Sequence, residues 1–211
     1  MITTETTKVY EINRAPDGCW MGSNYRCMSS KELTAALRAE FRANGIKGVT
    51  VSFESYTGGR TINVKITPTE ADFTPLPEYL EKMREPLDFS QFSFIEDNGK
   101  RLNSTDCLNL PPEERYSLYA RLCTERYNHI YETGNKYGEQ IFGIPQDEWD
   151  ARRWRYKNIF TEAFLDKLRL VEKIVDSYNY DESDPMTDYF SRGFCDFFYI
   201  MPRKKSKAKA A

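Results

Sequence analysis

The fold of this chain is decided by the stretch Val49-Thr50-Val51-Ser52-Phe53-Glu54-Ser55-Tyr56-Thr57-Gly58-Gly59-Arg60-Thr61-Ile62-Asn63-Val64-Lys65-Ile66. Apolar residues alternate with polar ones on both sides of a Thr-Gly-Gly-Arg turn. Alternation of period two around a glycine turn predicts a β-hairpin with one buried face.

A helix is predicted directly before this hairpin, over residues 30–43. Ser29 and Glu32 have the spacing of a capping box, in which two side chains satisfy the free backbone donors at a helix start. Leu33, Leu37 and Phe41 then recur at helical spacing. Asn44-Gly45 is a typical helix stop.

After a long interval, a second amphipathic helix is predicted over residues 162–178 and an aromatic strand over residues 193–200. Between them lies Asn179 to Phe190, which is dense in tyrosine and carboxylate. We interpret it as the structural junction between helix and strand. Its acids could also ligate a hard cation, but it lacks the glycine and glutamate of an EF-hand loop, and the sequence leaves this open.

Residues 69–161 are predicted to form a mostly helical insertion. It would hold helices at about 76–83, 111–134 and 145–160, and a strand or apolar plug near 89–95. The last of these helices could continue into 162–178, or Thr161-Glu162 could begin a new one.

The predicted fold class is therefore α+β. A small antiparallel sheet, made of the hairpin and the C-terminal strand, packs on helices. Residues 1–68 and 162–200 form one discontinuous domain, 69–161 the helical insertion, and 201–211 a basic disordered tail.

Charge and cysteine content narrow the class of protein. The 211 residues carry a formal charge of −2, and the last eleven hold five cations and no acid. The remaining 25 basic and 32 acidic residues give −7, which argues against a nucleic-acid-coating protein. Five cysteines without a CxxC pair or a signal peptide indicate reduced thiols and a cytoplasmic location. No apolar run approaches about 20 residues, so no membrane span is expected.

Catalytic motifs are scarce. His129 is the single histidine, so a Ser/His/Asp or Cys/His arrangement would have to use it. Its spacing places it at the edge of an apolar helical stripe, which is typical of a half-solvated core boundary. Cys107, Cys123 and His129 lack zinc-finger spacing, and no glycine-rich phosphate loop is present. We therefore expect no catalytic residue, no metal and no cofactor, and a protein that is not an enzyme.

The best candidate for binding is the basic-aromatic segment 149–157. Guanidinium groups can pair with phosphates, and aromatic rings can stack on bases. The alternative is that the arginines pair with acidic loops while Trp149 and Tyr156 are core residues. The predicted partner-binding or nucleic-acid-binding residues are Trp149, Arg152, Arg153, Trp154, Arg155 and Lys157.

Two segments resemble one known family. They are Glu32 to Pro68, with SFESYTGGRT (52–61) around the turn, and Ser177 to Ile200, which begins SYNYDESDPMTDYF (177–190). Together they resemble the large polyvalent protein associated domain 29, a small α+β module of phage and conjugative-element proteins. The resemblance implies no catalytic residue. It implies a setting in which a small free-standing protein serves as an accessory or counter-defence factor.

These observations predict a non-catalytic accessory protein of a mobile genetic element that acts by macromolecular binding. Its target would be a protein or ribonucleoprotein, such as a host defence complex of the CRISPR or restriction type, which would make it an anti-CRISPR-like inhibitor. The alternative is a nucleic-acid-binding accessory protein that uses the 149–157 segment and the tail.

Overall fold

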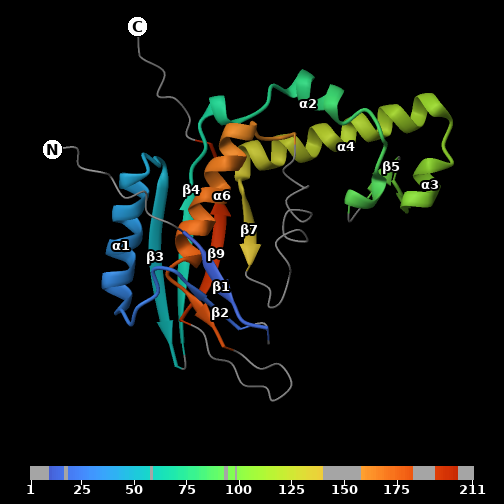
Figure 1. Ribbon diagram of the computed structural model, residues 1–211. Helices are drawn as coiled ribbons and strands as arrows, with labels where there is room; N and C mark the ends of the chain where they lie inside the picture. The colour runs from blue at the N-terminus through green and yellow to red at the C-terminus, as the bar shows by residue number, and fades with distance from the viewer. Residues whose placement is uncertain are drawn as a thin grey trace, which may run out of the picture. The chain divides into compact units, whose positions relative to one another are not determined.

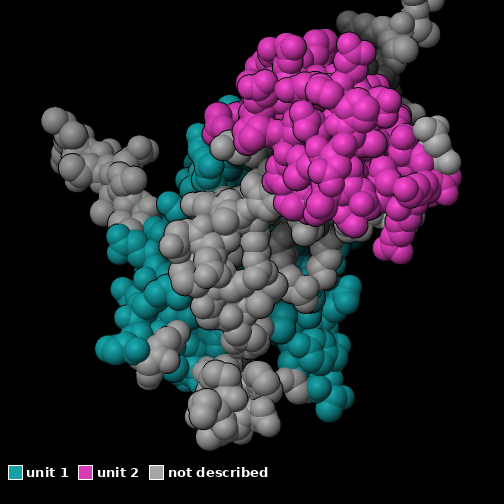
Figure 2. All heavy atoms as spheres, turned by 90° about the vertical axis from the view of Figure 1, so that its right-hand side faces the viewer, with its two compact units in different colours: residues 1–67, 136–143, 163–200 teal, residues 68–135, 144–162, 201–211 magenta. Residues whose placement is uncertain are grey.

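The computed structural model describes residues 10–16, 19–57, 59–92, 95–97, 99–139, 158–182 and 193–203, with only the backbone described at 91 and 135–139. The chain divides into two compact units, coloured separately in Figure 2. Unit 1 comprises residues 1–67, 136–143 and 163–200, and unit 2 comprises 68–135, 144–162 and 201–211.

Figure 1 shows the elements of both units. Unit 1 holds, in chain order, β1 (Ile12–Arg14), β2 (Trp20–Gly22), α1 (Ser30–Ala43), β3 (Val49–Tyr56), β4 (Gly59–Ile66), β7 (Asn135–Glu139), α6 (Glu162–Asp176), β8 (Tyr180–Asp181) and β9 (Cys195–Ile200). The first residue of β7 and the first residue of α6 are assigned to unit 2. Unit 2 holds the short helix η1 (Glu70–Asp72), α2 (Leu76–Lys82), the short helix η2 (Phe89–Gln91), β5 (Ile95–Asp97), β6 (Lys100–Leu102), α3 (Ser104–Leu108) and α4 (Pro112–Thr133).

The predicted hairpin is confirmed as β3 and β4, which pair antiparallel from Val49 opposite Ile66 to Tyr56 opposite Gly59. Ile62, Val64 and Ile66 are fully buried, as the alternation predicts. Burial in β3 ends after Val51, however, and Phe53 is 44% exposed. β3 is an edge strand of the order β3-β4-β9-β7, so it has a neighbouring strand on one side only.

The predicted helix start is confirmed at α1. Ser29 N donates to Glu32 Oε2 at 2.8 Å, and Glu32 N donates to Ser29 Oγ at 3.3 Å. The hydrogen bonds from Ser29 hold the pKa of the Glu32 carboxyl below its ordinary value, because they favour the charged form. The helix ends before Gly45, whose φ of +66° is easily adopted by glycine.

The predicted α+β fold class is confirmed, but the prediction that the C-terminal strand pairs antiparallel was wrong. The C-terminal strand β9 lies beside β4, and the two run parallel, with Ile62 opposite Asp196 and Ile66 opposite Ile200. Parallel neighbours require a connection of a dozen or more residues. The chain between Ile66 and Cys195 is far longer than that, so β9 can enter the sheet from the same end as β4. Apolar alternation predicts which residues of a strand are buried, but it does not predict whether the strand pairs parallel or antiparallel.

The first four residues of the predicted junction, Asn179 to Glu182, belong to the described residues, and 183–190 lie outside them. Asn179 is 1% exposed. Its side chain bonds the backbone of Phe194, just before β9, and its carbonyl accepts from Gly22 N of β2 at 2.9 Å. β8 pairs with β2 in a three-stranded β1-β2-β8 sheet. Asn179 therefore joins the end of α6, the small sheet and the approach to β9.

Helix α6 begins at Glu162 as a new helix and does not continue from a preceding one. This answers the question, left open by the sequence, of whether one helix or two run through this region. Just before it, Asn158 has a φ of 71° and Phe160 forms an isolated β-bridge with Phe73. A helix cannot continue through residues in these conformations. The segment predicted as the preceding helix, 145–157, lies outside the described residues.

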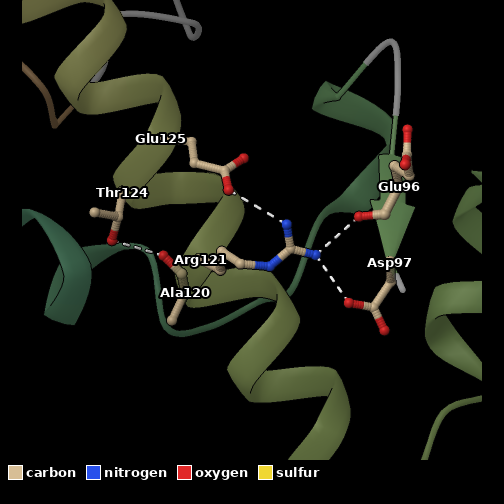
Figure 3. A network of polar contacts seen from close by, with 6 residues as sticks. All are labelled: Glu96, Asp97, Ala120, Arg121, Thr124 and Glu125. Carbon is tan, nitrogen blue, oxygen red and sulfur yellow. Dashed lines mark hydrogen bonds and ion pairs between the residues drawn. The ribbon is translucent and has the colours of Figure 1, made fainter. Parts of the chain in front are cut away.

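Unit 2 is organised around α4, which matches the helix predicted at 111–134. Its buried side chains include Tyr119, Cys123 and Tyr127, and the ring of Tyr127 packs against Tyr79 of α2 with centroids 5.3 Å apart. Figure 3 shows Arg121 of α4 holding the β5–β6 hairpin: it donates to Glu96 O at 2.8 Å and pairs with Asp97 at 3.0 Å. The apolar segment near 89–95 is a short 3-10 helix followed by β5.

The structure also bears on the expected absence of a membrane span and on the predicted C-terminal tail. None of the helices in the described parts of the chain has the length and apolar character needed to cross a membrane. Of the predicted tail, residues 201–203 are described, and Arg203 pairs with Glu70 at 3.3 Å while its guanidinium lies 4.3 Å from the ring centre of Tyr131. Residues 204–211 lie outside the described residues.

Candidate binding edge of the central sheet

The structure does not place the site residues predicted from the sequence. Six residues, Trp149, Arg152, Arg153, Trp154, Arg155 and Lys157, lie outside the described residues, so their role stays a prediction. In the predicted acidic stretch, Asp181 is nearly buried and Glu182 is exposed, and Asp184 and Asp188 are not described. Within the described ranges, no three His, Cys, Asp or Glu side chains cluster as metal ligands would.

The described cysteines of unit 2 are poorly suited to nucleophilic chemistry. Cys123 is fully buried, and burial raises its pKa to about 11. Cys107 is also fully buried, and burial raises its pKa as well. The thiolate is the reactive form, so both thiols stay protonated and unreactive near neutral pH. His129, predicted at a core boundary, is exposed on α4.

A surface with unused bonding capacity lies at the outer edge of β3. Paired residues in an antiparallel ladder alternate between hydrogen-bonded and non-bonded pairs. Thr67 N donates to Gly48 O at 2.8 Å, so the next pair along, Val49 with Ile66, is a non-bonded one. The same parity makes the backbone groups of Val51, Phe53 and Ser55 point away from β4.

One of these outward backbone groups, the carbonyl of Val51, accepts a hydrogen bond, and those of Phe53 and Ser55 have no described partner. Arg38 Nη2 of α1 donates to Val51 O at 2.6 Å. Among the described residues, no hydrogen bond uses the backbone N–H or C=O of Phe53 or Ser55. These two residues therefore present two donors and two acceptors at the edge of the sheet.

Large exposed rings flank these open groups on both faces of the sheet. Phe53 lies on the face that carries Ile62 and is 44% exposed. Tyr56 lies on the opposite face and is 55% exposed. Successive side chains of a strand alternate between faces, so a strand pairing with β3 would lie next to Phe53. The ring of Tyr56 instead lies over Gly59 of β4 and extends toward Cys195 of β9.

The turn end of the hairpin contacts β9, the residue Gly193 before it and the segment before α1. Arg60 of β4 donates from Nε to Gly193 O at 2.8 Å and from Nη1 to Met28 O at 2.6 Å. The Tyr56 hydroxyl lies 3.9 Å from the sulfur of Cys195. These contacts hold the hairpin to β9 and to the segment before α1.

Sequence reasoning located the hairpin but not this edge. Whether β3 or β4 is the outer strand depends on where β9 pairs, more than 100 residues later. One signal was visible: β3 contains no lysine and no proline, two residues with which proteins block exposed sheet edges.

Comparisons of the chain with protein-family models, curated proteins and solved structures gave no match, so no relative assigns a role to this edge.

Proposed function

We propose that this protein is a non-catalytic accessory factor that acts by binding another protein, and that the β3 edge is its binding surface. The observation that carries the proposal is the open backbone of Phe53 and Ser55 beside the exposed ring of Phe53. An unpaired strand edge is a template for pairing with another chain. The occupant is an extended segment of the partner, added as a further strand.

Strand addition explains why main-chain and side-chain features coincide here. Hydrogen bonds from the added strand to Phe53 and Ser55 would supply affinity, and its alternating side chains would supply specificity. Exposed Phe and Tyr are typical anchors of protein interfaces, because each ring buries a large area with little loss of side-chain freedom. Glu54, also exposed, favours a partner segment with a cation at the matching position.

The proposed setting comes from the resemblance to the domain 29 modules of phage and conjugative elements. The hairpin that carries the edge is one of the two segments of that resemblance. We propose a cytoplasmic protein or ribonucleoprotein target, with a host defence complex of the CRISPR or restriction type as its class. The second candidate, a nucleic-acid-binding accessory protein, has the predicted 149–157 segment in its favour.

The test compares two substitutions at one position. Ser55→Pro removes the outward N–H, which the hairpin does not use, and Ser55→Ala keeps it. Pull-down from a nuclease-treated host lysate should recover one defined protein complex with the wild type and with Ser55→Ala, and lose it with Ser55→Pro. Circular dichroism should show that all three are folded.

Two results would contradict the proposal. Equal recovery of the partner by Ser55→Pro would exclude strand addition at this edge. A partner that is lost after nuclease treatment would favour the second candidate, in which nucleic acid is the primary ligand.

A further inference from the structure

The outward face of α1 carries a line of cations. Lys31, Arg38 and Arg42 are exposed and, with Ala35, fall on one side of the helix at spacings of four, three and four residues. Lys47 follows in the loop after the helix and is also exposed. Eleven residues of helix span about 16 Å, so the line runs along most of the 14-residue helix.

The carboxylates of the same helix are held in other contacts. Glu32 is bound in the capping box by Ser29. Glu40 is half-buried, and its two oxygens accept hydrogen bonds from the hydroxyls of Tyr10 and Tyr178, each at 2.8 Å. Among the described contacts, no ion pair joins either acid to Lys31, Arg38, Arg42 or Lys47.

Five surface cations elsewhere in the described structure form ion pairs, while others, among them Arg14, Lys65 and Lys100, pair with no described carboxylate. Ion pairs of 2.6–3.9 Å join Lys82 to Glu78, Arg84 to Glu81, Arg121 to Asp97, Arg169 to Asp166 and Arg203 to Glu70. No described carboxylate pairs with Lys31, Arg42 or Lys47 either, and their alignment along one side of α1 and the loop after it sets them apart from scattered cations. Arg38 uses one nitrogen for Val51 O and keeps its other donors.

We propose that this face of α1, defined by Lys31, Arg38, Arg42 and Lys47, binds the phosphate backbone of a nucleic acid. The phosphates of one strand of a duplex are spaced by about 3.4 Å along the helix axis, so a line of about 16 Å can meet several of them. The inference concerns a different surface from the β3 edge and does not depend on the proposed function.

The side chains between the cations favour a nucleic acid over an acidic protein. Ala35 and Ala39 are exposed, and the outward face of the helix has no aromatic or large apolar residue. Protein interfaces depend on such anchors, and base-reading surfaces use aromatic stacking. A basic face without aromatic rings cannot stack on bases, so we expect mainly backbone contacts and a weak dependence on base sequence.

The experiment measures fluorescence anisotropy of labelled single-stranded and duplex oligonucleotides of mixed sequence with the full chain. Salt is raised from about 50 to about 200 mM, the range in which phosphate contacts are lost. The charge-reversal pair K31E/R42E is compared with K82E/R84E. The control pair changes the net charge by the same amount, at exposed cations that lie at the end of α2 and just after it. The neutral pair K31Q/R42Q serves if the reversal unfolds the helix.

Removing two phosphate contacts should lower the slope of log affinity against log salt by about 1.8 on duplex and about 1.4 on single strands. The K82E/R84E control should keep the wild-type slope. The inference is overturned if the wild type does not bind at about 50 mM salt, where phosphate contacts are strongest. It is equally overturned if both variant pairs lose affinity alike, or if reversal at Arg152, Arg153 and Arg155 alone removes all binding. Equal affinity for polyglutamate would make the face an acidic-protein site instead.

Discussion

The side-chain amide of Asn179 bonds both backbone polar groups of Phe194: Nδ2 donates to Phe194 O at 2.9 Å, and Oδ1 accepts from Phe194 N at 3.0 Å. The side chain thus takes the place of a neighbouring strand at a residue that is 1% exposed. Buried backbone groups almost always need a partner, so this contact satisfies two groups that no strand reaches. It fixes the start of β9 to the end of α6.

Asn179→Ala should lower the free energy of unfolding by about 2 to 4 kcal/mol, because it leaves a buried N–H and a buried C=O unsatisfied. Asn179→Asp should cost a similar amount, since it keeps the acceptor and replaces the donor. Urea unfolding measures both. Asn24→Ala is the control, because it removes a half-buried hydrogen bond from Nδ2 to Ser177 Oγ at 3.0 Å, and we expect a loss of about 1 kcal/mol. Equal losses at both positions would contradict the bridging role.

Gly22→Ala should destabilise unit 1 by steric overlap. A Cβ at this position would lie 2.4 Å from Asp176 O and from the Ser177 backbone. Overpacking against backbone cannot be relieved by a side-chain rotation, so we expect a loss of about 3 kcal/mol in urea unfolding.

The control for this prediction is Gly45→Ala. Gly45 has open space around its Cβ position but a φ of +66°, so alanine there should cost about 1 to 2 kcal/mol from backbone strain alone. If Gly22→Ala proved milder than Gly45→Ala, the close approach of β2 to the end of α6 would be wrong.

Local sequence signals predicted local structure well. The capping box at Ser29, the hairpin around Thr57 and the α4 helix were all predicted from residues within a few positions of one another. The parallel pairing of β9, the exposure of Phe53 and the bridge from Asn179 to Phe194 were not. Each depends on a return of the chain after a long interval, and no short-range pattern encodes it. The predicted binding segment around Trp154 lies outside the described residues and stays a prediction.

Arg121→Ala should cost about 1 to 2 kcal/mol in unit 2. Most of the loss should come from its bond to Glu96 O, since its two ion pairs are exposed and weak. Raising the salt concentration should therefore leave most of the difference in place. Glu125→Ala removes only the i,i+4 pair and should cost about 0.3 to 0.5 kcal/mol. A difference that disappears at high salt would assign the network to ion pairing.

Alkaline pH should destabilise unit 2 through Tyr119. Burial raises its pKa from the ordinary 10.0 to about 12. Below pH 10 both states carry the neutral phenol, so the stability is fully present. Between about pH 10 and 12 only the unfolded chain ionises, so stability falls as the pH rises. The stability of Tyr119→Phe, measured by urea unfolding, should fall less over this pH range than that of the wild type. An unchanged pH dependence in Tyr119→Phe would contradict the burial effect.

Thiol reactivity tests whether Cys123 and Cys107 are structural. Cys27 is exposed, while Cys107 and Cys123 are fully buried. Brief alkylation at about pH 8 followed by peptide mass mapping should label Cys27 and leave both buried thiols unlabelled, because the reagent reaches an exposed thiol and not a buried one. Burial raises the pKa of Cys123 to about 11, which suppresses its thiolate further. In urea all three should react alike. Rapid native labelling of Cys123 would instead reveal an accessible, activated thiol, and would make a nucleophilic enzyme a serious alternative to a binding protein.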